Sequence, residues 1–373
     1  MSDPEGLTYE PGLDGLRAVA IASVLCFHAF ASSGVTGWFL GGNLGVSVFF
    51  TLSGFLITSL LLREQQQTGS VRVGRFLARR VRRLLPAAAT VTVLVVVLSR
   101  TKWLSLHVSD AVGAVWSFTN WHVIASGQDA LLRTIVGPLG PTWSLAVEEQ
   151  VYLGLLILVL LCARARPVAL PISLALVCAG SWIAANLVSN WSPRLEFGTD
   201  VRAGEIAIGA LLAVVVQRLP DLATRRRWLD AVSSTAFVAL TVCIVRVNYR
   251  PPWLLRGGFG VIAALSACAV LGVVSHGPLH RLLSAAPLVQ VGRISYSLYL
   301  VHWPVFLVLT EARVGVAGWA LVGVKIGVAI VIATLLHVAI ERPFRRLELA
   351  PHRALSAWLV TSGAVTALAM LVL

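Results

Sequence analysis

Two ionisable residues, Arg17 and His28, lie in the first apolar stretch of the chain, LDGLRAVAIASVLCFH. They are eleven residues apart, so an α-helix brings the second side chain only about 20° past three full turns from the first. Both side chains therefore share one helix face, about 16 Å apart along the axis. If this helix crosses a membrane, the cation lies near one surface and the imidazole lies deep in the bilayer. An ionisable side chain at that depth is costly and is a functional-site hypothesis by default.

A second histidine, His302, lies in the middle of another apolar stretch, GRISYSLYLVHWPV. Tyr299 precedes it by three residues and shares its helix face. A neutral imidazole can accept a proton from a hydroxyl group while that hydroxyl attacks an acyl carbon. The residues therefore permit acyl transfer with His28 as the base or as a transient acyl carrier, and we predict that Tyr299 and His302 line the cavity.

Two adjacent carboxylates, Glu148 and Glu149, begin the apolar run TWSLAVEEQVYL, in which Trp143 is the second residue. The positive end of the helix dipole explains one glutamate in the first turn of a span, but it explains a buried pair poorly. Neighbouring residues point about 100° apart, so at least one carboxylate should face the protein interior. We predict that Glu148 orients an imidazole or the acceptor, and that Glu149 and Trp143 contact the acceptor.

A basic cluster, RRVRRLLP, contributes Arg79, Arg80 and Arg83 next to the start of a span. Residues 79 and 83 share a helix face. One interpretation is a stop-transfer signal that contacts lipid headgroups. The other is a polyphosphate site, because the guanidinium fork matches phosphate oxygens. Both interpretations stay open on the sequence alone.

The composition identifies the class of protein that holds these residues. Of the 373 residues, 57% are hydrophobic and 13% are charged, and the mean hydropathy is +0.83. These values predict an all-α, polytopic transmembrane helical bundle. Most Lys and Arg residues fall on one side if the N-terminus is cytoplasmic, as the positive-inside rule requires. We predict ten or eleven spans, near residues 15–33, 44–62, 84–99, 143–162, 168–189, 203–217, 229–247, 257–275, 294–311, 317–338 and 355–373.

The last of these spans follows a basic segment, so we divide the chain into a membrane domain of about ten spans (1–346) and an additional C-terminal helix (347–373). The formal net charge of +13 is attributed to membrane topology and not to nucleic-acid binding. The five cysteines are scattered through apolar stretches and indicate no disulfide framework, thiol nucleophile or metal site. No hydrolase elbow, zinc-protease motif or phosphate-binding loop of an ATPase is present.

Six segments, in this order, resemble the acyltransferase 3 family of integral-membrane O-acyltransferases. They are LDGLRAVAIASVLCFH, GVSVFFTLSGFLIT, RRVRRLLP, TWSLAVEEQVYL, GRISYSLYLVHWP and ERPFRR, and they extend from about residue 11 to residue 346. The family's pattern of a basic residue followed by histidine eleven positions later falls on Arg17 and His28. Its basic inner motif falls on Arg79, Arg80 and Arg83, and its acidic signature on Glu148. Many members carry Asp where this chain has Ser47.

The resemblance implies a multi-pass protein of the bacterial plasma membrane that transfers an acyl group, usually acetyl, from cytoplasmic acyl-CoA to a hydroxyl group. Acyl-CoA, usually acetyl-CoA, is then a co-substrate, and no metal is expected. The implied acceptors contain sugars, as in cell-envelope glycans, glycolipids and macrolides. Some relatives continue into an extracytoplasmic esterase-type domain, so the same scheme here implies a separate extracytoplasmic partner protein.

Two other functions remain open on the sequence. Polar groups aligned across a bilayer also suit a transporter or flippase of a lipid-linked sugar or an acyl carrier. Alternatively, the buried charges could pair only with one another in a membrane scaffold. Product mass separates the first alternative from an enzyme, because transport leaves the mass of the substrate unchanged.

Overall fold

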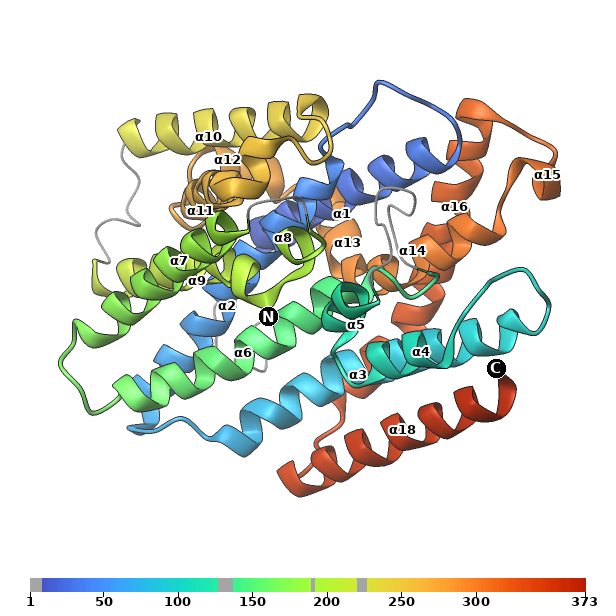
Figure 1. Cartoon of the computed structure of the whole chain (residues 1–373). Helices are drawn as coiled ribbons and strands as arrows, with labels where there is room; N and C mark the ends of the chain where they lie inside the picture. The colour runs from blue at the N-terminus through green and yellow to red at the C-terminus, as the bar shows by residue number, and fades with distance from the viewer. Residues whose placement is uncertain (1–8, 127–136, 189–191, 220–226) are drawn as a thin grey trace. The chain divides into compact units, whose positions relative to one another are not determined.

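In a computed structural model, every regular element of the part of the chain that the structure describes (residues 9–126, 137–188, 192–219 and 227–373) is helical (Figure 1). Those elements are α1 (Pro11–Ser32), η1 (Gly42–Leu44), α2 (Gly45–Thr68), α3 (Val73–Ser99), α4 (Val108–Val115), α5 (Thr119–Ala125), α6 (Thr142–Cys162), α7 (Ala169–Leu187), α8 (Arg194–Phe197), α9 (Thr199–Arg218), α10 (Arg227–Arg246), η3 (Leu254–Gly258), α11 (Phe259–Val274), α12 (Pro278–Leu283), α13 (Ala286–Arg293), α14 (Ser295–Val308), α15 (Glu311–Val314), α16 (Gly318–Leu336), η4 (His337–Glu341), α17 (Arg342–Arg346) and α18 (Pro351–Val372).

Nine helical segments among the described residues are long and apolar enough to cross a membrane. They include α1, α3, α6, α7, α10 and α18, together with three segments that join adjacent elements: Gly42–Thr68, Leu254–Val274 and Gly318–Arg346. The two other predicted spans are also helical, as the 20-residue α9 and the shorter apolar α14. The chain is therefore a polytopic helical membrane protein, as its composition predicted.

The chain divides into two compact units. Unit 1 comprises Met1–Phe27, Gly37–Val71 and Glu148–Ser295, and unit 2 comprises His28–Thr36, Arg72–Val147 and Tyr296–Leu373. The helices α1 and α6 each contribute residues to both units.

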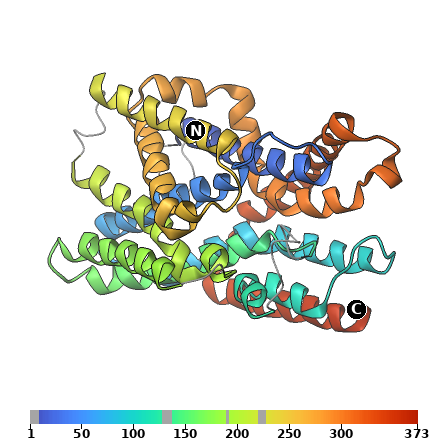
Figure 2. The same ribbon diagram turned by 45° about the horizontal axis from the view of Figure 1, so that its top comes forward.

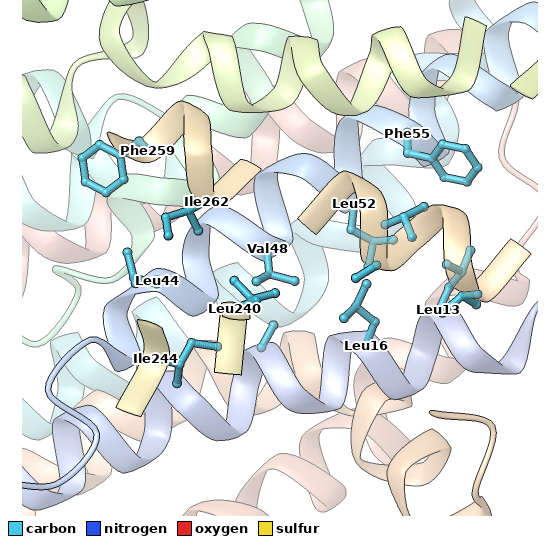
Figure 3. Packing of buried hydrophobic residues seen from close by; sticks show 14 of the residues in the cluster. Leu13, Leu16, Leu44, Val48, Leu52, Phe55, Leu240, Ile244, Phe259 and Ile262 are labelled. Carbon is cyan, nitrogen blue, oxygen red and sulfur yellow. The ribbon is translucent and has the colours of Figure 1, made fainter. Parts of the chain in front are cut away.

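The core of unit 1 is an aliphatic cluster drawn from α1, α2, α10 and α11. Figure 3 shows Leu16, Val48, Leu52, Leu240 and Ile262 with their side chains in this cluster. All five are at most 1% exposed, so these helix faces lie against protein and not against lipid.

Two glycines let α2 and α9 approach closely. A Cβ atom on Gly54 would lie 1.9 Å from the main-chain oxygen of Ile206, and one on Gly209 would lie 1.9 Å from that of Thr51. Small residues commonly mediate helix contacts in membranes because they bring the two backbones together. The substitution of either glycine by alanine would force the helices apart.

Two charged residues of α9 pair with each other inside unit 1. Nε of Arg202 lies 2.5 Å from Oε1 of Glu205, and both side chains are almost fully buried. The guanidinium also stacks over the ring of Phe259, 3.8 Å from its centroid. Pairing of this kind is what allows charged residues within an apolar bundle, and it explains why α9 has a less apolar sequence than its neighbours.

In unit 2, α18 lies along α3 and α4, and Figures 1 and 2 show α18 beside α3 in both views. Nε1 of Trp116 donates to Oγ1 of Thr366 at 3.1 Å, and Arg100 donates to the main-chain oxygen of Val372 at 2.9 Å. The C-terminal helix thus belongs to unit 2 and packs against α3 and α4. Its separation from residues 1–346 as an additional domain stays a prediction.

Candidate active site

Unit 2 brings His28 and His302 together from helices that are 274 residues apart in the chain. Nδ1 of His28 lies 3.0 Å from Nε2 of His302. The two rings are nearly parallel, with an interplanar angle of 13° and centroids 5.2 Å apart. His302 is fully buried, and His28 is partly buried. The two deep histidines of the sequence therefore form one hydrogen-bonded pair.

The second ring nitrogen of His302 decides how the protons are arranged in this pair. Nδ1 of His302 lies 2.7 Å from the main-chain oxygen of Tyr299, one helical turn earlier in α14. A carbonyl oxygen only accepts hydrogen bonds, so Nδ1 of a neutral His302 carries the proton and Nε2 carries the lone pair. His28 must then donate from Nδ1, which leaves the lone pair of neutral His28 on its Nε2.

The Tyr299 side chain fixes the turn of α14 that supplies this carbonyl. Its hydroxyl donates to the main-chain oxygen of Pro141 at 2.9 Å and lies 2.7 Å from Oγ of Ser144. Both residues lie at the start of α6, and Tyr299 and Ser144 are buried. The hydrogen bonds therefore connect the start of α6 to the helix that carries His302.

Aromatic rings cover the histidine pair on two sides. The ring of Trp303 lies 5.3 Å from that of His28, and its Nε1 donates to the main-chain oxygen of Gly137 at 3.1 Å. The ring of Phe306 lies edge-on to His302 at 5.7 Å. These contacts leave each imidazole little freedom to rotate, which is a condition for precise proton transfer.

A buried lysine holds the end of the helix that carries His28. Nζ of Lys325 donates to both the main-chain oxygen and Oγ of Ser32, each at 2.8 Å. Ser32 is one turn beyond His28 in α1, and Lys325 is only 1% exposed. A cation at a helix C-terminus satisfies carbonyl groups that lack an intrahelical donor. Lys325 therefore anchors the C-terminal end of α1, which belongs to unit 2.

The predicted basic cluster lies on α3, also in unit 2. Arg79, Arg80 and Arg83 are half-buried, and the guanidinium of Arg80 lies 5.7 Å from the centroid of the Phe76 ring. The helix α17 packs against α3. That contact adds a second basic segment to the first, through the exposed residues Arg342, Arg345 and Arg346.

A hydrogen bond connects α3 to the start of α14. The hydroxyl of Tyr296 donates to the main-chain oxygen of Leu84 at 2.7 Å. Glu341, which is 2% exposed, accepts from Ser297 at 2.7 Å and from His337 at 2.9 Å. A buried carboxylate thus joins η4 to the helix that carries His302.

Arg17 belongs to unit 1, where it pairs with Asp14 at 3.1 Å. The hydroxyl of Tyr9 donates to the other oxygen of Asp14 at 2.9 Å and accepts from Arg293 at 3.0 Å. Partial burial and the nearby Asp14 carboxylate raise the pKa of Tyr9, so the hydroxyl stays protonated at neutral pH. Asp14 thereby pairs with Arg17 directly and with Arg293 through the Tyr9 hydroxyl.

Glu148 also belongs to unit 1, and both of its oxygens accept hydrogen bonds there. Oγ of Ser53 lies 3.1 Å from Oε1, and the hydroxyl of Tyr152 lies 2.8 Å from Oε2. Glu149 in the same helix is half-buried, as is Trp143 at the end of α6 that belongs to unit 2. The orienting role predicted for Glu148 and the acceptor contacts predicted for Glu149 and Trp143 stay predictions.

The structure thus places His28 against His302, and His302 against Tyr299. That these residues line one catalytic cavity stays a prediction. Sequence reasoning missed Trp303 and Lys325 as supports of this pair. Lys325 carried a usable signal, since it is a lone cation inside an apolar span. Trp303 carried no signal of its own, because tryptophan is common in membrane helices.

These features define a multi-pass helical membrane protein with a buried, hydrogen-bonded histidine pair. The Acyl_transf_3 family model, which describes an acyltransferase domain, matches residues 10–340. The chain therefore belongs to the acyltransferase 3 family, as the six motifs indicated.

Curated relatives carry the name O-acetyltransferase OatA. Those of Staphylococcus aureus strains NCTC 8325 / PS 47 and COL are each 32% identical to this chain over 314 residues. Each alignment covers 80% of this chain and 51% of the relative. The chain thus spans about half the length of these relatives. No solved structure matches it.

Proposed function

We propose that this protein is a membrane O-acyltransferase that moves an acyl group, acetyl in the simplest case, from acyl-CoA to a hydroxyl group of a sugar-containing acceptor. The observation that carries the proposal is the chain of hydrogen bonds from the Tyr299 carbonyl through His302 to His28. It leaves the basic lone pair on Nε2 of His28, and it resembles the orienting of a catalytic histidine by a third group in a triad.

In the proposed reaction, Nε2 of His28 accepts the proton of the acceptor hydroxyl while the oxygen attacks the carbonyl carbon of the thioester. The new C–O bond forms, the C–S bond breaks, and the electron pair leaves with the sulfur. The resulting imidazolium returns its proton to the thiolate, which gives the ester and free CoA thiol. His28 ends in its starting state, and no redox partner is required. A variant of this scheme has His28 carry the acyl group transiently.

The donor site in this proposal is the basic end of α3. Arg79, Arg80 and Arg83 bind the CoA phosphates, because Arg forks pair well with phosphate oxygens, and the neighbouring α17 adds positive charge. The same residues support a cytoplasmic N-terminus by the positive-inside rule. The protein then lies in the plasma membrane of a bacterium, and acyl-CoA enters its site from the cytoplasm.

The remaining roles rest on the sequence motifs. Arg17 binds a CoA phosphate or polarises the thioester, Glu148 orients an imidazole or the acceptor, and Glu149 and Trp143 contact the acceptor. For Tyr299 and His302, the observed hydrogen bonds support positioning of His28 more directly than contact with the acceptor. A separate extracytoplasmic partner protein is part of the same proposal.

The test is release of free CoA thiol by the purified protein in nanodiscs supplied with acetyl-CoA and envelope extract, with mass analysis of the extract. We expect wild type to release thiol and to add the mass of an acetyl group to a glycan or glycolipid. His28→Ala should do neither while remaining monodisperse. A transporter instead leaves every mass unchanged, and that result, with no thiol release by folded wild type, would overturn the proposal.

A further inference from the structure

A cluster of three metal-binding side chains lies in unit 1, outside the acyl-transfer machinery. Its members are Glu10, immediately before α1, His276, between α11 and α12, and His280 in α12. One carboxylate oxygen and one imidazole nitrogen from each histidine lie within 4.8 Å of one another. We propose that this cluster binds a divalent transition-metal ion of the zinc type, and the proposal is independent of the proposed function.

The distances between the side chains fit such an ion. Nε2 of His276 lies 3.1 Å from Oε1 of Glu10, and Nδ1 of His280 lies 3.5 Å from Oε2. Zinc bonds of about 2.0–2.1 Å in tetrahedral geometry hold neighbouring ligand atoms about 3.3 Å apart. The measured separations are close to that value on both sides of Glu10, so binding needs only a small rotation of the side chains.

Glu10 is available as a ligand. Its Oε2 is buried, and no donor among the described residues hydrogen-bonds to it. A buried carboxylate oxygen without a hydrogen-bond donor is costly. A cation between the carboxylate and the two imidazoles would compensate that charge directly.

An unusual backbone conformation presents His276 to Glu10. His276 has φ of +58°, in the left-handed region that residues other than glycine rarely adopt. Its ring lies 4.6 Å from that of His280, at an angle of 35°. The left-handed turn thus places the two imidazoles side by side, four residues apart, although the His276 side chain stays 61% exposed.

Close packing brings α1 up to these histidines. A Cβ atom on Gly12 would lie 2.7 Å from Cγ1 of Val273 and 3.5 Å from Nδ1 of His280. Nδ1 of His280 also lies 3.2 Å from the main-chain oxygen of Val273, to which it donates in the absence of an ion. Zinc binding at Nδ1 would replace this hydrogen bond and requires the tautomer with the proton on Nε2. Only a glycine at position 12 lets the first turn of α1 sit against this corner.

Two imidazoles and one carboxylate suit zinc and its neighbours among the divalent transition metals, and not magnesium or calcium, which prefer oxygen ligands. Three protein ligands leave a fourth position for water. Because the ligands come from two distant segments, the ion would fix the start of α1 to the corner between α11 and α12. Ion binding would therefore stabilise the folded protein.

The test uses full-length protein without a histidine tag, purified in detergent and stripped with a chelator. The binding of ZnCl2 is measured by titration calorimetry, and the zinc content per chain is measured by inductively coupled plasma mass spectrometry. The unfolding temperature is measured with and without zinc. We expect one zinc ion per chain and a higher unfolding temperature with zinc. Glu10→Gln and His276→Ala should each weaken binding at least tenfold, whereas the exposed His352→Ala should bind as wild type does.

Cobalt provides a measurement that needs no variant. Co²⁺ in a tetrahedral site with nitrogen and oxygen ligands absorbs visible light far more strongly than aqueous Co²⁺, so wild type should show that absorption at one equivalent. The proposal is wrong if stripped wild type binds no zinc, or if the two ligand variants bind it with unchanged affinity. A weak, octahedral cobalt spectrum would likewise reject it.

Discussion

Nδ1 of His28 lies 3.0 Å from Nε2 of His302, and the two rings stack almost in parallel. The Tyr299 carbonyl fixes the proton on the far side of His302, so the pair has one neutral arrangement of protons. His28 is the residue that carries out proton transfer in the proposed reaction. His302 is a positioning residue that acts through it.

Removal of the His28 imidazole should abolish acyl transfer. General-base catalysis contributes about 10²–10⁴-fold in rate, so His28→Ala should reduce thiol release by at least 100-fold. His352→Ala, on the exposed face of α18, is the matched histidine control and should keep wild-type activity. Activity within tenfold of wild type in folded His28→Ala would show that another group is the base.

Substitution of His302 should lower kcat with little change in KM. We expect about 100-fold loss for His302→Ala, because groups that orient a functional imidazole contribute about 10–100-fold at metal sites and more in a catalytic triad. His302→Gln should recover part of this loss, since its amide oxygen can accept from Nδ1 of His28. Steady-state kinetics of both variants check this. Equal activity of the two variants would indicate a purely structural role.

Tyr299→Phe separates the hydroxyl of this residue from its main-chain carbonyl. The variant keeps the main-chain carbonyl that accepts from His302. It removes the hydrogen bond between the Tyr299 hydroxyl and buried Ser144, at a cost of about 1–3 kcal/mol. We expect a lower unfolding temperature and a loss of activity smaller than that of His302→Ala. If Tyr299→Phe loses as much activity as His302→Ala at unchanged stability, the hydroxyl itself acts on the substrate.

The arginines of α3 should control the affinity for the acyl donor. We expect Arg79→Ala and Arg83→Ala each to raise KM for acetyl-CoA about tenfold, or about 1.4 kcal/mol, with kcat nearly unchanged. Lysine at either position should restore part of the affinity, because it keeps the charge but not the fork. Arg164→Ala, at an exposed position in unit 1, is the control and should leave KM unchanged.

A network in unit 1 predicts how stability depends on pH. The hydroxyl of Tyr249 donates to Oε1 of Glu196 at 2.6 Å, and Nε of Arg250 donates to Oε2 at 2.5 Å. Burial, followed by the Glu196 charge, raises the pKa of Tyr249 well above its usual value. The neutral hydroxyl therefore contributes its full stabilisation below about pH 10, the pKa in the unfolded chain, and this contribution is lost as pH rises further.

Thermal unfolding between pH 7 and pH 11 measures this effect. We expect Tyr249→Phe to lower the free energy of unfolding by about 1–2 kcal/mol at pH 7. Above pH 10, the free energy of unfolding of the variant should fall less than that of wild type. Parallel curves for the two proteins above pH 10 would mean that Tyr249 does not titrate differently in the folded and unfolded states.

The amino-acid sequence was enough to assign this protein to its class and to place some candidate residues on common helix faces. Long apolar runs cross a membrane only as helices, because the backbone must satisfy its own hydrogen bonds there, so composition predicted the helical bundle. The i, i+3 spacing put Tyr299 and His302 on one helix face. The order of the six motifs, TWSLAVEEQVYL among them, indicated the acyltransferase 3 family.

The contacts between side chains of distant helices became known only from the three-dimensional structure. That His28 contacts His302, that Lys325 reaches Ser32, and that Glu10 meets His276 and His280 depends on how distant helices pack. Helix periodicity fixes the direction of a side chain around its own axis and says nothing about the neighbouring helix. Packing of side chains into one another sets that neighbour and its register. It also fixes the tautomer of His28, because the carbonyl and imidazole that fix its proton lie on another helix.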